Sequence, residues 1–375
     1  MTEKTTALYG QHQAAGASFT DFGGWQMPLK YTSELAEHRA VREAAGLFDL
    51  SHMGEVRVSG PDAGAFLDYA LAGKLSAVKV GRAKYSLITD ADGGIIDDLI
   101  SYRLADDEFL VVPNAGNATV VAGELAARAE DFDVAVTDES ADTSLVAVQG
   151  PKAEQILLRL VPGDAHGAVT GMKYYAAAPV SLDLGAGGAA EMLVARTGYT
   201  GEDGFEIYVP NAQAADLWSA LLAAGADDGL IPAGLACRDS LRLEAGMPLY
   251  GNELNRDLDP YAAGLGPVVS LAKEGDFVGR AALKKLSGTE PARKLVGLKG
   301  SGRRSARSGY PVLAGGRTVG EVTSGAPSPT LGYPIALAYV DTALAEPGTA
   351  VEVDLRGRPE AFEVVTLPFY RRDRS

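Results

Sequence analysis

The sequence predicts an α+β fold that ends in an all-β, barrel-like domain. Glycine and proline number 45 and 19 in a chain of 375 residues, so they divide it into many short elements. Valine, isoleucine and tyrosine are frequent between these breaks, which favours strands over long helices. From about Lys294 onward the strand-like segments are interrupted by Gly or Pro roughly every 8 to 12 residues, a rhythm typical of a small barrel or sandwich.

Helix signals occur where a capping residue or a proline begins a segment and a glycine ends it. Ser33 can cap a first helix that Gly46 would end. Pro151 stands at a first-turn position, where its missing N–H costs nothing. Asn211 can cap a longer helix whose leucines share one face. The helices expected from these signals cover residues 33–45, 61–72, 150–160, 211–225 and 234–246.

The apolar stretches between these helices predict strands. In the first 290 residues we expect strands at 54–58, 84–89, 95–103, 109–113, 144–149, 192–197 and 205–209. In the C-terminal part we expect them at 295–300, 310–316, 318–325, 336–340, 350–355 and 361–367. The length of the chain predicts two or three domains.

Composition and charge exclude several classes of protein. Lys and Arg number 34 against 49 Asp and Glu, and the net charge of −15 argues against a protein that binds nucleic acid. No apolar run reaches the ~18 residues of a membrane span, and no basic region followed by an apolar stretch opens the chain. The single cysteine, Cys237, excludes a disulfide framework. We therefore expect a soluble, cytoplasmic protein.

Catalysis, if present, has to rest on carboxylates. The four histidines show no metal-ligand spacing, and the sequence contains no P-loop, G-x-S-x-G, H-E-x-x-H or C-x-x-C motif. Asp97 and Asp98 lie next to each other in an otherwise apolar strand, where an unpaired buried carboxylate is costly. Either one of them faces a cleft, or both lie at a frayed strand end in water.

Two further segments combine charge with an apolar setting. In residues 195–209, three glycines surround Tyr199, and Glu206 lies within the strand FEIYV. Glycine lets backbone approach a ligand, and a carboxylate can accept two parallel N–H bonds from a guanidine-like edge, although a hairpin with an exposed Glu would look the same. In the helix 234–246, Arg238 requires a partner, either a ligand or an internal Asp or Glu.

Taken together, these segments resemble the aminomethyltransferase of the glycine cleavage system, the T-protein family. The matching motifs follow the order of the family along nearly the whole chain. They are DFGGWQMPL (21–29), GLFDLSHMGE (46–55), YSLITDADGGIIDDLI (85–100), AVQGPKA (147–153), RTGYTGEDGFEI (196–207), LACRDSLRLEAGMPLYGNEL (235–254), SGAPSPTLG (324–332) and PFY (368–370).

The resemblance implies a three-domain cloverleaf around a central folate site. We place an N-terminal folate-binding α+β domain at 1–145, with part of 240–280, a ferredoxin-like α+β domain at 146–290, and a β-barrel domain at 291–375. The implied reaction passes an aminomethyl group from the lipoyl arm of the carrier H-protein to tetrahydrofolate. The products are methylenetetrahydrofolate, ammonia and the reduced lipoyl arm. Tetrahydrofolate is a co-substrate, and neither a metal nor a flavin is implied.

Family motifs also assign roles to residues. Asp98 corresponds to the catalytic carboxylate, Glu206 to the acid that holds the pteridine edge, and Arg238 to a ligand-binding arginine. The remaining positions expected at the folate and substrate pocket are Met53, Tyr85, Tyr102, Asn114 and Tyr199. In the variable tail, the resemblance leaves open whether Tyr370, Arg371 or Arg374 reaches the site.

Other proteins share this architecture, so we weighed other functions. One is a tetrahydrofolate-dependent demethylase, and another is a non-catalytic folate-binding module in iron–sulfur assembly, against which Asp98 speaks. The C-terminal half of a dimethylglycine or sarcosine dehydrogenase is disfavoured because no flavin domain precedes this chain. Residues 284–320 hold nine Lys or Arg and one Glu. This basic stretch is either a solvated face or a docking surface for an acidic carrier or a folate glutamate tail.

Overall fold

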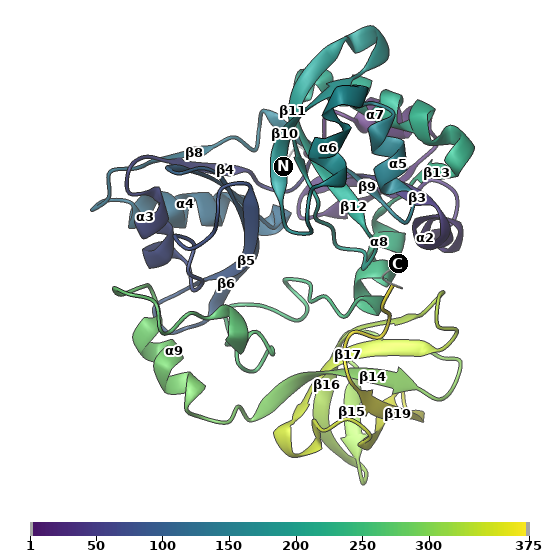
Figure 1. The fold of residues 1–375 in the computed structure, drawn as a ribbon. Coiled ribbons are helices and arrows are strands. Elements are labelled where there is room, and N and C mark those ends of the chain that lie inside the picture. The colour runs from purple at the N-terminus through teal and green to yellow at the C-terminus, as the bar shows by residue number, and fades with distance from the viewer. Residues whose placement is uncertain (1–2, 373–375) are drawn as a thin grey trace. The chain divides into compact units, whose positions relative to one another are not determined.

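The computed structural model of the chain describes residues 3–372, which group into two compact units (Figure 1). The first unit holds the residues up to Leu67, Leu75–Tyr85 and Leu99–Arg238. The second holds Asp68–Lys74, Ser86–Asp98 and the residues from Asp239 onward. The boundaries of the three expected domains and their cloverleaf arrangement stay predictions, and Arg374 lies outside the described residues.

A six-stranded sheet forms the centre of the first unit. Its spatial order is β10-β11-β12-β9-β3-β13, in which β13 pairs with β3 in parallel and the other pairs are antiparallel. The strands are β3 (Ala45–Asp49), β9 (Thr143–Gln149), β10 (Ala177–Asp183), β11 (Ala189–Ala195), β12 (Gly204–Pro210) and β13 (Leu230–Pro232). Its middle strands β12 and β9 are paired along seven residues, which gives side chains on β12 a rigid support.

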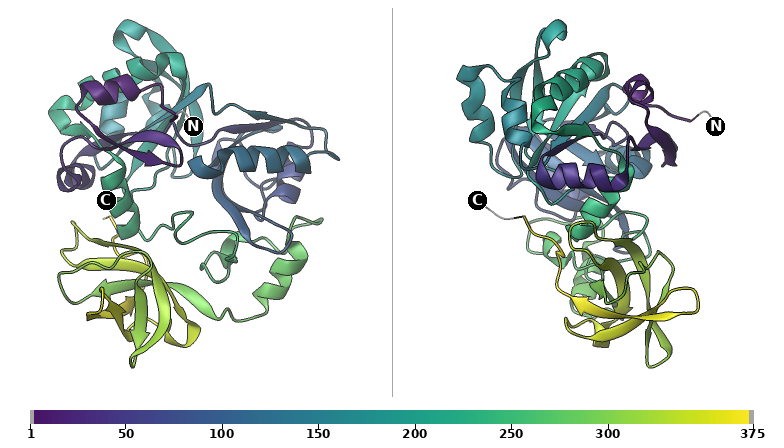
Figure 2. Two further views of the ribbon diagram at one scale, coloured as in Figure 1. Left: turned by 180° about the vertical axis from the view of Figure 1, so that it is seen from behind. Right: turned by 90° about the vertical axis from the view of Figure 1, so that its right-hand side faces the viewer.

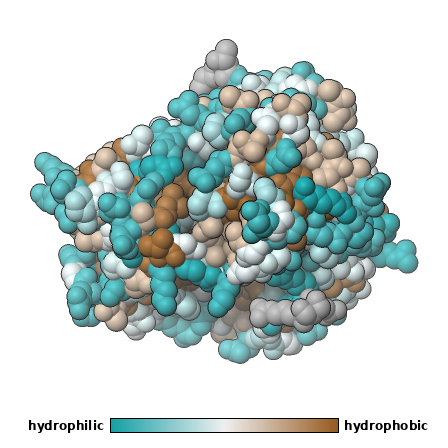
Figure 3. All heavy atoms as spheres, turned by 45° about the horizontal axis from the view of Figure 1, so that its top comes forward, coloured by the Kyte–Doolittle hydropathy of each residue, from teal (hydrophilic) through white to brown (hydrophobic). Residues whose placement is uncertain are grey.

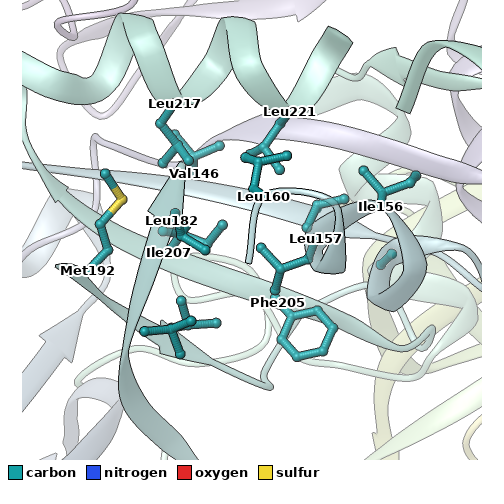
Figure 4. Packing of buried hydrophobic residues seen from close by; sticks show 14 of the residues in the cluster. Val146, Ile156, Leu157, Leu160, Leu182, Met192, Phe205, Ile207, Leu217 and Leu221 are labelled. Carbon is teal, nitrogen blue, oxygen red and sulfur yellow. The ribbon is translucent and has the colours of Figure 1, made fainter. Parts of the chain in front are cut away.

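Helices cover one face of this sheet and enclose its hydrophobic core. They are α5 (Ala153–Leu158), α6 (His166–Thr170) and α7 (Asn211–Gly225). Leu217 and Leu221 of α7 point toward Val146 and Ile207 on the sheet (Figure 4), and all four side chains are buried. Each such burial contributes about 1.5–3 kcal/mol, so the sheet is held firmly beneath its helices.

A second sheet has five strands in the order β5-β6-β7-β4-β8. They are β4 (Val56–Ser59), β5 (Arg82–Thr89), β6 (Ile95–Ala105), β7 (Glu108–Pro113) and β8 (Ala135–Asp138), and the accompanying helices are α3 (Ala63–Ala70) and α4 (Ala118–Arg128). The strand β6 is shared by the two units. Its residues up to Asp98 belong to the second unit, and those from Leu99 onward belong to the first.

The N-terminal segment consists of α1 (Tyr9–Ala14) and the hairpin β1 (Ser18–Phe22) and β2 (Trp25–Lys30), followed by α2 (Glu34–Glu43). A buried polar cluster anchors it. His12 Nε2 lies 2.8 Å from Asp49 Oδ2, and Tyr31 Oη lies 2.9 Å from His12 Nδ1. Burial acts to raise the pKa of Asp49, but hydrogen bonds from His12, Ser51 and Thr6 lower it overall, so the ionised carboxylate is stabilised.

The second unit contains α9 (Arg280–Ser287) and a closed six-stranded barrel, which Figure 2 shows from two further sides. Its strands are β14 (Arg293–Gly300), β15 (Pro311–Ala314), β16 (Arg317–Pro327), β17 (Pro334–Asp341), β18 (Ala350–Asp354) and β19 (Pro359–Val365). Alternate side chains point inward along each strand, and those of Leu298, Val322 and Val353 are fully buried. The α+β fold and the C-terminal barrel predicted from the sequence are confirmed.

The remaining helix is α8 (Leu235–Glu244), which extends from the end of the first unit into the second. Within the second unit its Arg242 is buried, with its guanidinium 3.0 Å from Glu253 Oε2 and 2.8 Å from Ser324 Oγ. The polar partners of Arg242 tie α8 to β16.

Short 3-10 helices occur at Ala115–Asn117, Gly163–Ala165, Gly185–Gly187, Ala226–Asp228, Gly266–Val268 and Thr342–Leu344.

Most expected elements are present, and three details were wrong. Pro151 does not stand in the first turn of a helix, because α5 begins at Ala153 with Lys152 as its N-cap. Ser33 caps α2 as predicted, with its hydroxyl accepting from the Ala36 N–H at 3.1 Å, but the helix ends at Glu43. Gly46 lies in β3, where a Cβ atom would come within 2.5 Å of Val41. Asn211 does not cap α7, because its side chain instead accepts from Ser144 and donates to the Ala141 carbonyl.

On the face drawn in Figure 3, hydrophobic residues are interspersed with hydrophilic ones. The large apolar side chains that remain exposed include Phe22, Val80 and Tyr174. None of the helices within residues 3–372 has the length and hydrophobicity that a membrane-spanning helix requires.

Candidate functional site

Glu206 is a carboxylate of the first unit that is positioned to bind a ligand. It lies on β12, paired with Ala195 of β11 on one side and Ala147 of β9 on the other. Its Oε2 accepts hydrogen bonds from the hydroxyl of Thr197 and, at 3.3 Å, from that of Tyr102. Oε1 accepts no hydrogen bond from any described residue. A half-buried carboxylate with one oxygen held and the other open is suited to binding an N–H donor.

Tyr102 is a buried hydrogen-bond donor to Glu206 and does not line an open surface. Its side chain is fully buried, and its hydroxyl lies 2.9 Å from Thr197 Oγ1. Tyr208 packs edge-on against it, with 5.7 Å between the ring centroids. Burial raises the pKa of both tyrosines well above the usual value, and the charge of Glu206 adds to the effect. Both hydroxyls therefore stay protonated, and that of Tyr102 donates to Glu206.

Packing requires glycine at two positions, Gly198 in the loop before β12 and Gly204 at the start of β12. A Cβ atom on Gly198 would lie 2.0 Å from Gln149 Oε1, and one on Gly204 would lie 2.4 Å from Gln149 Nε2. Gln149 donates to the Thr197 carbonyl at 3.0 Å and accepts from the Thr200 hydroxyl at 3.0 Å. We expected these glycines to admit a ligand, whereas here they make room for a buried amide that shapes the loop.

Arg238 and Tyr199 form a second part of the site. The guanidinium carbon of Arg238 lies 4.7 Å from the centroid of the Tyr199 ring, a cation–π distance. The nearby His52 is buried, and its Nδ1 has no hydrogen-bond partner among the residues described. Burial, followed by the positive charge of Arg238, lowers the pKa of His52 to about 4. His52 is therefore neutral near pH 7.

The deeply buried arginine of α8 is Arg242 and not Arg238. Arg242 has two internal acid partners, Glu253 and Asp239. Glu244 is also buried, and its carboxylate accepts from the hydroxyls of Ser328 and Thr330. These residues of the helix motif serve the architecture of the second unit.

Asp97 and Asp98 differ in burial. Asp97 is fully buried, while Asp98 is half-buried. Alternation along β6 places the side chain of Asp98 on the same face of the strand as that of Tyr102. Of the two adjacent acids, Asp98 is the one that keeps access to solvent, and it lies at the end of its segment of the second unit.

The other expected pocket residues are half-buried on separate elements. Met53 directly follows His52, and Tyr85 lies within β5. Asn114 follows Pro113, the residue of β7 that pairs with Leu99 of β6. None of these three side chains hydrogen-bonds to Glu206. The structure thus joins Tyr102 with Glu206 and Tyr199 with Arg238.

Our reading of the sequence missed Thr197, His52 and Tyr208. His52 directly precedes Met53, and Thr197 lies two residues before Tyr199. Only the folded chain shows what they contact. Within residues 3–372, His, Cys, Asp and Glu form no group of three or more that could hold a metal ion.

Comparisons with known proteins cover almost the whole chain. Residues 8–273 match the family model of the GCVT N-terminal domain, and residues 293–371 match that of the glycine cleavage T-protein C-terminal barrel domain. An aminomethyltransferase of Streptomyces avermitilis is 58% identical over 98% of both chains, and one of Cutibacterium acnes is 56% identical over 99% of both. The crystal structure of glycine cleavage system aminomethyltransferase T from Bartonella henselae superposes with a TM-score of 0.90, at 39% identity and 98% coverage of both chains.

Proposed function

Because the chain belongs to the glycine cleavage T-protein family of aminomethyltransferases, we propose that it passes a one-carbon unit from an aminomethylated lipoyl carrier to tetrahydrofolate. The C–S bond to the lipoyl arm and the C–N bond to ammonia break, and two C–N bonds to folate nitrogens form. The two folate N–H hydrogens leave on ammonia and on the thiol. The observation that carries this proposal is the carboxylate of Glu206. Its Oε2 accepts hydrogen bonds from Tyr102 and Thr197, and its Oε1 accepts none from the described residues.

Glu206 is proposed to bind the pteridine. The N–C–N edge of that ring presents planar N–H donors, and the oxygen Oε1 of Glu206 is open to accept one of them. Thr197 donates to Oε2 and so fixes the carboxylate plane before the ligand arrives. Such pre-organisation reduces the entropy lost on binding.

Asp98 is proposed to be the catalytic carboxylate. Loss of ammonia leaves a cationic, iminium-like carbon, which a fixed negative charge stabilises. The same carboxylate can orient the folate nitrogen that attacks this carbon. Asp98 is half-buried while its neighbour Asp97 is fully buried, so Asp98 is the acid that a substrate can reach.

Arg238 and Tyr199 are proposed to provide a flat, positively charged wall of the pocket. The cation–π contact at 4.7 Å holds the guanidinium against the Tyr199 ring, and the carboxylates of the folate tail carry the opposite charge. Met53, Tyr85 and Asn114 are proposed to complete the lining.

The lipoylated carrier is proposed to dock on the basic stretch 284–320. Lys284 and Lys285 of α9 are exposed, as are Arg303, Arg304 and Arg317 in and beside the barrel. An acidic carrier would be steered to such a surface, so its apparent KM should rise with ionic strength. A KM that does not respond to salt would contradict this docking surface.

The cytoplasmic location expected from the sequence is kept as part of the proposal.

The deciding experiment supplies the protein with tetrahydrofolate and aminomethylated carrier and measures ammonia. The Asp98→Asn variant should lose at least ~100-fold in kcat while its Kd for tetrahydrofolate stays within about threefold of wild type. Near-normal turnover by Asp98→Asn would refute its catalytic role. A demethylase would instead consume a small methylated substrate and release no ammonia from the carrier.

A further inference from the structure

The helix α2 contacts both of the segments that carry Arg238 and Tyr199. Arg238 lies in the first turn of α8, and Tyr199 lies in the loop between β11 and β12. All of these residues belong to the first unit. Two charged side chains of α2, Glu37 and Arg42, make the contacts, and the proposed reaction uses neither of them.

Glu37 holds the beginning of α8. Its side chain is fully buried, and its Oε2 accepts a hydrogen bond from the Gly234 N–H at 2.9 Å. Its Oε1 accepts from the N–H groups of Tyr31 and Thr32 at 2.8 and 2.9 Å. Gly234 closes the first turn of α8, since its carbonyl accepts from the Arg238 N–H at 3.2 Å. The place of the Arg238 backbone therefore depends on where Glu37 holds Gly234.

Arg42 holds the loop that carries Tyr199. It lies in the last turn of α2, and only 7% of its side chain is exposed. Its Nη1 donates to the Thr200 carbonyl at 2.7 Å and to Glu202 Oε1 at 2.8 Å. The Glu202 side chain is buried as well, and a charge-assisted hydrogen bond shielded from water is strong. Because Thr200 directly follows Tyr199, the backbone beside the ring is tied to α2.

These contacts act on the two members of one pair. The guanidinium carbon of Arg238 lies 4.7 Å from the centroid of the Tyr199 ring. Such a contact needs the cation within about 6 Å of the centroid, so a small shift of either segment weakens it. Glu37 and Arg42 lie on the same ten-residue helix, whose internal hydrogen bonds keep their separation fixed.

We propose that Glu37 and Arg42 are positioning residues through which α2 sets the spacing of Arg238 and Tyr199 before a ligand binds. A pocket wall that is already in place loses less entropy on binding. Only the identity of the ligand, tetrahydrofolate, is taken from the proposed function. Because this wall is proposed to contact the folate tail and not the reacting carbon, loosening it should raise KM and leave kcat nearly unchanged.

The first test measures the pair itself and needs no ligand. The ring current of Tyr199 shifts the proton NMR signal of the Arg238 Nε–H group, which is the signal lost in Arg238→Lys. Tyr199→Leu gives the position of this signal without the ring. Arg42→Met and Glu37→Gln should each move the signal at least halfway toward that position. If both variants keep the wild-type position, the proposal is wrong.

Arg57→Met is the matched control for this test. Arg57 also pairs with two carboxylates, those of Glu108 and Glu139, but it lies in the five-stranded sheet of the same unit. Its replacement removes a comparable ion pair and should leave the Arg238 signal unchanged.

The second test measures steady-state kinetics and tetrahydrofolate binding by calorimetric titration. Arg42→Met should raise KM and Kd for tetrahydrofolate about tenfold and leave kcat within about threefold of wild type. A variant that only loses folded protein would show a lower apparent kcat at an unchanged KM. Glu37→Gln should resemble Arg42→Met, because its amide N–H₂ faces at least one backbone N–H. Arg42→Lys should stay within about threefold of the wild-type Kd, because one lysine nitrogen can make both contacts of Nη1.

A double-variant cycle shows whether Arg42 acts through Tyr199. In a Tyr199→Leu background, Arg42→Met should weaken tetrahydrofolate binding no further. Additive effects, or a wild-type KM in Arg42→Met, would overturn the proposal. If Arg42→Met does not fold, Arg42→Met combined with Glu202→Met replaces it, since no buried carboxylate is then left unpaired. If the wild-type protein itself fails to bind tetrahydrofolate, the proposed function is wrong, and the NMR signal alone decides whether α2 positions the pair.

Discussion

Replacing Glu55 by glutamine should change how the stability of the first unit depends on pH. The pKa of Glu55 is raised from 4.5 to about 9 in the folded chain, mainly by burial. Between these two values the folded chain keeps a proton that the unfolded chain has released. The unfolded chain then binds fewer protons, so the free energy of unfolding falls as the pH rises through this window.

The size of the effect follows from one proton. The free energy of unfolding of the wild type should lose about 1.4 kcal/mol per pH unit from this site. Between pH 6 and pH 8, which lie inside the window, the Glu55→Gln variant should gain about 3 kcal/mol relative to wild type. Other titrating groups contribute equally to both proteins and cancel in the difference.

Tryptophan fluorescence during urea unfolding is a suitable assay. The two tryptophans of the chain, Trp25 and Trp218, both belong to the first unit, as does Glu55. The difference in unfolding free energy between wild type and Glu55→Gln is measured at pH 6, 7 and 8, with Ser101→Ala as the control that carries no titrating group. A difference that stays constant across this range would show that Glu55 is ionised in the folded protein and would refute the reasoning.

Three further predictions concern other sites. Glu206→Gln removes the carboxylate charge and should weaken tetrahydrofolate binding by about 10- to 100-fold, because hydrogen bonds to charged groups contribute about 1.5–3 kcal/mol; a Kd within twofold of wild type in a calorimetric titration would contradict this. Arg242→Met leaves Glu253 buried without its partner and should cost about 3–5 kcal/mol in scanning calorimetry, and an unchanged transition of the second unit would be evidence against it. Burial and Arg238 lower the pKa of His52 from 6.5 to about 4, so the unfolded chain takes up a proton first as the pH falls through this range. Stability should drop by about 1.4 kcal/mol per pH unit there in wild type but not in His52→Gln, and parallel pH profiles would argue otherwise.

Local patterns in the sequence were enough to predict most of the elements. Ser33, with its hydroxyl three residues before the N–H it caps, marks the start of α2 because capping involves only near neighbours in the chain. The Gly and Pro breaks that recur every 8 to 12 residues after Lys294 predict the barrel strands, because turn residues act on their immediate neighbours in the chain. The motifs that surround Asp98, Glu206 and Arg238 likewise identify the family, because each is a continuous segment.

The sequence by itself therefore determined the elements, the fold class and the chemical groups available to the site. Only the tertiary structure decided which of these groups are buried and what each one contacts. It showed that Asp97 is buried while Asp98 is accessible, and that Gly198 makes room for Gln149. The reason is physical, since burial and hydrogen bonding depend on segments far apart in the chain. The hydroxyl of Tyr102 reaches Glu206 across 104 residues, a contact that no local pattern contains.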